Sequence, residues 1–161
     1  MTLEGDAYAR ITKAAGRESM RCTLIGYAVA LLIILPISIG NARVFFVSQF
    51  IFPFFLVSLT LFIAANVLGR IFGGLIYRNG NRRIMPWLAG VATAWLSVIV
   101  STILGCLPAA ILETDDLSRF GQNLFDYVGK PMIWTAIFGS IPSTLLGLYF
   151  AARIKRLLPL P

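Results

Sequence analysis

Histidine is absent from this 161-residue chain, and cysteine occurs only twice. Without an imidazole, ligation of haem or of a metal by histidine and catalysis by a histidine base are excluded. Cys22 and Cys106 form no C-x-x-C motif, and their expected depths in the membrane differ by roughly 28 Å, whereas a disulfide needs Cα atoms within ~7 Å. The nucleotide-binding motif G-x-x-x-x-G-K-[ST] and the nucleophile motif G-x-S-x-G are missing as well. We therefore expect no enzyme activity, no metal site and no cofactor.

Charged residues are also scarce, at 13% of the chain against roughly 25% in soluble proteins. Residues 44–69 contain none, and a helix of about 26 residues at 1.5 Å rise is long enough to cross a bilayer. This stretch is apolar on every side, which is typical of a membrane span. The net charge of +7 lies beside such apolar runs and forms no stripe, so it favours an anionic lipid surface as the partner and not nucleic acid.

Four apolar segments, at about residues 23–40, 44–69, 87–112 and 132–152, predict an all-α integral membrane protein with one domain over residues 1–161. The short connections predict a four-transmembrane-helix bundle of two antiparallel hairpins with short interfacial helices. A signal peptide is the alternative for 23–40, but its apolar run exceeds the usual ~7–15 residues. Eleven lysines and arginines lie in the leader, the 70–83 connection and the tail, against three on the other side. The positive-inside rule then places both termini in the cytoplasm, and we expect the cell inner membrane.

Two polar segments lie outside these spans. Residues 1–21 predict either a short helix on the cytoplasmic surface or a frayed tail. In residues 113–131, Leu117, Phe120, Leu124 and Val128 recur on one helical face, which predicts an amphipathic helix at about 115–128 lying on the outer membrane interface. Gly129 and Pro131 should end this helix. Asp115 and Asp116 could pair as acid and base, but we favour an acidic helix start outside the membrane.

Small residues recur every four positions in the last two spans. The fourth span carries Gly139, Ser143, Gly147 and Ala151, and the third carries Ser97, Ser101, Gly105 and Ala109. Such stripes let helix backbones approach closely in lipid. We favour packing within the bundle, with an interface to another membrane protein as the alternative. The amides of Gln49 and Asn66 should also face the bundle interior or a partner, because an unpaired amide in hydrocarbon is costly.

Each predicted span contains one internal proline: Pro36, Pro53, Pro108 and Pro142. A proline removes a backbone hydrogen bond and bends its helix, so the outer halves of the spans should splay apart. The spans contain no aspartate, glutamate, lysine or arginine, which argues against a proton-coupled transporter.

These features favour a non-enzymatic inner-membrane protein that acts as an accessory, assembly or stabilising subunit of a larger membrane protein complex. Its expected partners are membrane lipid and other integral membrane proteins, or a second copy of the chain. One alternative is an immunity-type protein that binds a membrane-active toxin. Another is a binder or carrier of an apolar or lipid ligand in an outer-leaflet groove. The candidate interaction residues are Phe120, Leu124, Asp115, Asp116, Gly139, Ser143, Gly147, Gln49 and Asn66.

Overall fold

The computed structural model describes residues 3–39, 48–79, 84–112 and 117–157, and this part of the chain is helical with no strand. The elements, in chain order, are α1 (Leu3–Ile39), α3 (Ser48–Arg78), α4 (Met85–Leu112), the 3-10 turn η1 (Leu117–Arg119), α5 (Phe120–Leu124), the π-helical turn η2 (Phe125–Gly129) and α6 (Lys130–Leu157). The predicted all-α class is confirmed for the described residues.

Within the described part of the chain, three helices are long and apolar enough to cross a membrane: Phe54–Arg78, Met85–Leu112 and Phe120–Leu157. They correspond to the second, third and fourth predicted spans. The first predicted span, residues 23–40, forms most of the second half of α1, which is helical through Ile39. The side chains of residues 31 and 33–39 lie outside the described part of the chain.

Residues 3–21 are helical, as one expectation had it, but they form no separate short helix, and the alternative of a frayed tail is wrong for them. Helix α1 is continuous over 37 residues and carries the leader directly into the apolar segment. Ala15, Ser19 and Cys22 are spaced by four and three residues, so they share one face of α1, and all three are buried. Small side chains let this polar leader pack tightly against other helices.

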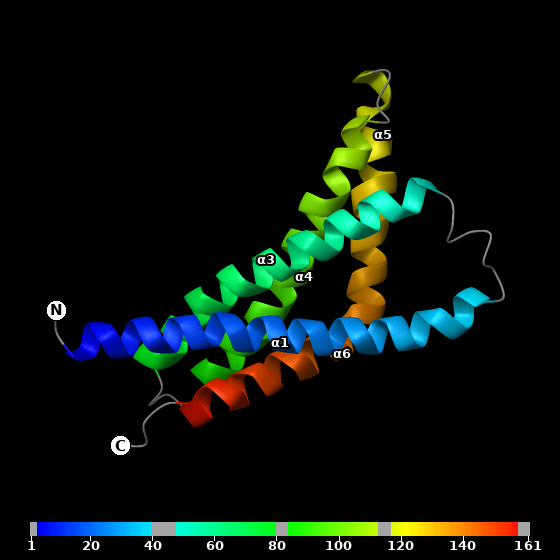
Figure 1. Cartoon of the computed structure of the whole chain (residues 1–161). Helices are drawn as coiled ribbons and strands as arrows, with labels where there is room; N and C mark the ends of the chain where they lie inside the picture. Colours follow the sequence, from blue (N-terminus) through cyan, green and yellow to red (C-terminus); the bar gives the residue numbers. More distant parts are fainter. Residues whose placement is uncertain (1–2, 40–47, 80–83, 113–116, 158–161) are drawn as a thin grey trace.

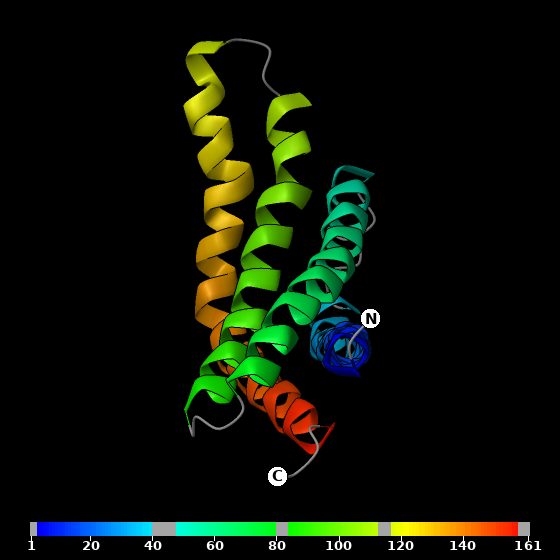
Figure 2. The ribbon, with the colours of Figure 1, turned by 90° about the vertical axis from the view of Figure 1, so that its left-hand side faces the viewer.

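Helix α1 crosses the other helices at one end of the molecule (Figure 1). Its first half packs on α3 and on the last part of α6, while α3 packs most extensively on α4. Viewed from the side, α1 is nearly end-on, and α4 rises together with α5 and α6 (Figure 2). The main core lies at the crossing and contains Ala15, Cys22, Ile76, Ala89, Phe150 and Ile154. We call this end of the molecule the crossing end.

The predicted outer helix is not a separate element on the membrane surface. Helix α5 continues through η2 into α6, so Gly129 and Pro131 do not end it. Pro131 lacks an N–H, and its ring would clash with the carbonyl four residues earlier. The π-helical turn η2 widens the helix just before Pro131, and the Lys130 N–H bonds the Phe125 carbonyl five residues back. A local change of pitch therefore replaces the expected break.

Helix α6 changes direction near its middle, where Pro142 lies (Figures 1 and 2). A proline inside a helix removes one hydrogen bond and introduces a kink of this kind. The outer half of α6 runs beside α4, and the inner half turns to follow α1. Pro142 thus allows one helix to contact two neighbours that have different directions.

Glycines stand where helices come closest. A Cβ added to Gly147 of α6 would lie 2.7 Å from the Gly90 carbonyl oxygen and 2.7 Å from the Val91 Cα of α4. A Cβ on Gly105 of α4 would lie 2.5 Å from the Val57 Cα of α3. Backbone atoms cannot move aside as side-chain ends can, so only glycine fits these helix crossings.

Candidate functional site

The predicted outer surface is divided in the structure. Leu124 is half-buried and packs against a second core cluster of Cys106, Ala110 and Val128, whereas Phe120 is exposed. Asp115 and Asp116 lie outside the described residues. Of these two described residues, Phe120 is therefore the more accessible.

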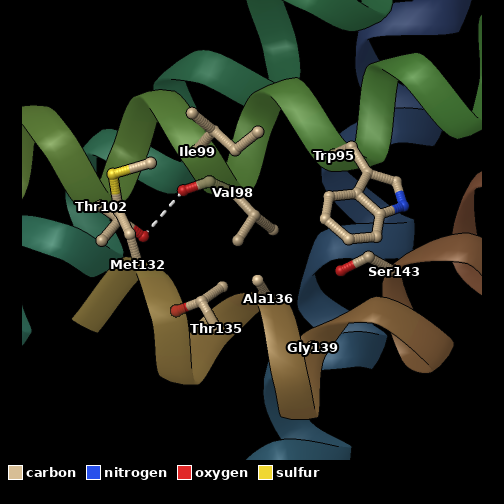
Figure 3. Close-up of a pocket in the computed structure, with 9 residues that line it drawn as sticks. All are labelled: Trp95, Val98, Ile99, Thr102, Met132, Thr135, Ala136, Gly139 and Ser143. Atoms are coloured by element: carbon tan, nitrogen blue, oxygen red, sulfur yellow. Dashed lines mark hydrogen bonds between the residues drawn. The ribbon is translucent and has the colours of Figure 1, made fainter. Parts of the chain in front are cut away.

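A small cavity separates the outer halves of α4 and α6, and two of the predicted residues, Gly139 and Ser143, line it (Figure 3). Its volume is about 100 Å³. Its lining residues are Trp95, Val98, Ile99, Thr102, Met132, Thr135, Ala136, Gly139 and Ser143. A cavity of this size corresponds to about three water volumes, and ligand pockets usually exceed ~300 Å³. It can hold the end of a chain or one side chain, but not a whole lipid.

The surface that this cavity exposes is almost entirely apolar, and several polar groups beside it are engaged in hydrogen bonds. The Thr102 hydroxyl donates to the Val98 carbonyl at 2.9 Å, as Figure 3 shows. The Trp95 Nε1 donates to the Thr144 hydroxyl at 3.2 Å and joins α4 to α6. Ser97 bonds back to the Thr93 carbonyl at 2.7 Å. The cavity therefore presents an apolar wall.

The other predicted residues lie elsewhere. Gly147 is buried at the α4–α6 crossing, opposite Gly90. Asn66 lies on α3, where its amide donates to the Met20 Sδ of α1 at 2.9 Å. The Gln49 side chain is outside the described part of the chain. Among the predicted residues that the structure describes, Gly139 and Ser143 thus line one cavity, while Gly147 and Asn66 lie at two other helix contacts.

The sequence analysis missed a buried carboxylate at the crossing end. Glu18 of α1 has a side chain only 12% exposed. It pairs with Arg21, three residues further along α1, at 2.7 Å and with Arg153 of α6 at 3.4 Å. The arginines are 68% and 42% exposed, so their charges remain in contact with solvent. This carboxylate ties the leader to the last turns of α6. In the sequence Glu18 lies between Arg17 and Arg21, and such alternating charges are typical of a helix face in contact with water. The sequence pattern therefore gives no sign that Glu18 is buried.

The sequence analysis also missed the close contact between α1 and α3. Gly69 and Gly73 form a G-x-x-x-G motif near the end of α3. Gly73 packs against Ala15, and Gly69 against Ser19 and the Ala15 carbonyl. The same four-residue spacing that identified the stripes in the last two spans would have found this pair, had it been sought beyond residue 69.

A groove runs along α3 where α1 crosses it, with a volume of about 710 Å³. Its lining residues are Met20, Leu59, Phe62, Ile63, Asn66, Val67, Arg70 and Ile71. We call it the α1–α3 groove. It lies in the size range of small-molecule and lipid sites.

Near Tyr27, α1 contacts α3. Tyr27 shares a 3.0 Å hydrogen bond with Ser58 of α3 and lies near the Phe54 and Phe62 rings. The next described residues, at positions 28–30 and 32, are all exposed, and they point to several sides of the helix. The outer half of α6 is exposed too, on a face that includes Trp134 and Phe138, whose rings stack at 5.4 Å. We call these two surfaces the outer faces of α1 and α6.

Comparison with protein-family models, with curated proteins and with solved structures finds no match for this chain. The functional argument therefore depends on the geometry alone.

Proposed function

We propose that this chain is a non-enzymatic inner-membrane protein that acts as an accessory, assembly or stabilising subunit of a larger membrane protein complex. The observation that carries the proposal is the contrast between the two ends of the molecule. At the crossing end, side chains from α1, α3, α4 and α6 bury one another. At the other end, the α1 residues at positions 28–30 and 32 are exposed, and the first half of α6 exposes Trp134, Phe138 and Ile141.

The outer faces of α1 and α6 expose large apolar side chains. Leu32 is 69% exposed and Phe138 is 69% exposed, and the stacked Trp134 ring adds a large aromatic surface. Aromatic side chains contribute strongly at protein interfaces, because they bury a large area with little loss of side-chain entropy. A rigid α1 held at its inner half presents such a surface to a partner at a fixed angle.

The topology is part of this proposal. All four long helices cross the membrane, residues 23–40 form the first span, and consecutive spans run in opposite directions, as two antiparallel hairpins. The start of α1, the end of α3, the start of α4 and the end of α6 lie at the crossing end (Figure 1). Most basic residues of the described chain lie in these segments, which supports a cytoplasmic crossing end with both termini inside.

The two alternative functions have less support. An immunity-type protein was expected to bind its toxin through the outer helix together with the spans, and α5, which begins that predicted helix, is instead continuous with α6. A carrier with an outer-leaflet groove needs room for its ligand, and the cavity between α4 and α6 has only about 100 Å³.

Site-specific photo-crosslinking in the native membrane tests the proposed function. A photoreactive residue at Val29 or Phe138 should capture the same integral membrane protein, and deleting the chain should lower the assembled amount of that protein. Leu88 is the matched control, since it is exposed and apolar but lies at the crossing end of α4. Lipid adducts alone at all three positions would contradict the proposal.

A further inference from the structure

The α1–α3 groove combines an apolar track with a cationic end. Leu59, Ile63 and Val67 follow one another at four-residue spacing, so they form a continuous line along α3, and each is about half exposed. At 1.5 Å per residue this line is about 12 Å long. Met20 of α1 forms the opposite wall.

Arg70 closes the track at the crossing end. Its side chain lies across Gly16 of α1: a Cβ added to Gly16 would be 2.8 Å from the Arg70 Cγ and 3.1 Å from its Nε. The same Cβ would be 3.1 Å from the Asn66 Oδ1. Gly16 thus leaves the space in which the guanidinium and the Asn66 amide sit side by side at the mouth of the groove.

Two further cations face this mouth. Lys13 and Arg17 precede Met20 by seven and three residues, so helical spacing places them on the Met20 side of α1, and both are exposed. Among the described residues, the ion pairs involve only Glu18 and Asp126 as acids, so Lys13, Arg17 and Arg70 have no carboxylate partner. Asp6 is seven residues from Lys13, about 10 Å along α1. The mouth therefore gathers three positive charges that the described chain does not neutralise.

We propose that the α1–α3 groove binds one anionic phospholipid of the cytoplasmic leaflet. One acyl chain lies along Leu59, Ile63 and Val67, and the phosphate sits at Arg70 with Lys13 and Arg17 around it. An arginine fork donates two hydrogen bonds to phosphate oxygens, and the unpaired cations supply complementary charge. The choice of the cytoplasmic leaflet depends on the topology given under the proposed function. The chemistry of the groove does not depend on that topology.

Native mass spectrometry after reconstitution tests this inference. The chain is reconstituted in vesicles of equal phosphatidylglycerol and phosphatidylcholine and then transferred to a mild detergent. We expect the wild type to retain one phosphatidylglycerol and no phosphatidylcholine. R70Q should lower the fraction of protein that retains phosphatidylglycerol about tenfold. I63W should lower this fraction too, because the larger side chain blocks the apolar track while the charges stay intact.

R156Q is the matched control, because Arg156 is exposed at the end of α6 and away from the groove. It should retain lipid as the wild type does. Equal retention of both lipids, or equal loss in R156Q and R70Q, would overturn the inference in favour of unspecific surface charge. A protein that copurifies with the wild type from the native membrane, before reconstitution, and is lost in I63W would overturn it in favour of a protein partner. Crosslinking at the outer faces of α1 and α6 does not involve the groove, so the two proposals fail separately.

Discussion

Replacing Gly73 with alanine should lift α1 from α3. The methyl group would overlap the Cβ of Ala15, which is fully buried and attached directly to the α1 backbone. A flexible side chain could turn away, but a Cβ cannot, so α1 itself must move. Overpacking of this kind costs about 3 kcal/mol at the upper end of the usual range, and alanine regains about 1 kcal/mol through its helix propensity. The net loss of about 2 kcal/mol corresponds to a roughly 30-fold higher population of lifted α1.

Cys22 reports this motion, because it lies on the same buried face of α1 and is 4% exposed. Burial, assisted by the Glu18 carboxylate, raises the pKa of the Cys22 thiol from 9.0 to about 11, while Arg153 acts in the opposite direction. At pH 8 the packed thiol is therefore protonated and unreactive. When α1 lifts, the pKa falls towards 9.0 and the thiolate becomes available. In a C106A background in mild detergent, G73A should raise the rate of Cys22 alkylation about 30-fold.

G139A serves as the control, because it makes the same glycine-to-alanine change in α6 instead of α3. A Cβ on Gly139 would meet only Thr135 and Ser143 of its own helix, at 3.4 and 3.9 Å. It should therefore leave the Cys22 alkylation rate unchanged. An unchanged rate in G73A, or an equal increase in both variants, would refute the role of the Gly73–Ala15 contact.

Two further predictions concern the crossing end. E18Q removes the charge that pairs with Arg153 and, after allowance for the solvent exposure of both arginines, should cost about 1 kcal/mol and raise Cys22 alkylation about fivefold. The control D126N, which breaks the exposed pair with Lys130, should not change the rate, and an equal effect of both variants would remove Glu18 from the packing. For topology, reporters fused after Tyr77 or Arg156 should behave as cytoplasmic and one at Gln122 as external. An external signal after Tyr77 would contradict the proposed orientation.

Some expectations from small residues agree with the packing. Ser97, Ser101 and Gly105 are buried on α4, as a stripe between close helices requires, although Ala109 is only half-buried. Gly147 lies at a helix crossing, but Gly139 does not touch another helix. The spacing identifies a face on which helices can approach. It does not tell which residue of the face stands at the crossing, because that depends on the crossing angle and on the kink at Pro142.

The sequence by itself predicted an all-helical chain with four spans, and the described residues are helical and contain three helices that are long and apolar enough to cross a membrane. A long segment without charged residues is enough to predict a membrane-spanning helix, because in hydrocarbon every backbone N–H and C=O must be paired within the helix. The ends of α4 and the continuation of α3 to Arg78 also follow from local composition. The function and the orientation stay predictions.

Only the tertiary structure decided what the polar segments do. Glu18 reads as one charge among several in the leader, yet it is buried because Arg153, 135 residues away, comes to it from α6. Pro131 reads as a helix stop, yet η2 absorbs it, and packing of Val128 on α4 holds the two helices in line. Local sequence sets which backbone shapes are available at each position. Contacts between helices that are distant in the chain decide which of these backbone shapes forms. The stabilisation from those contacts offsets the local free-energy cost of a buried charge or of a proline inside a helix.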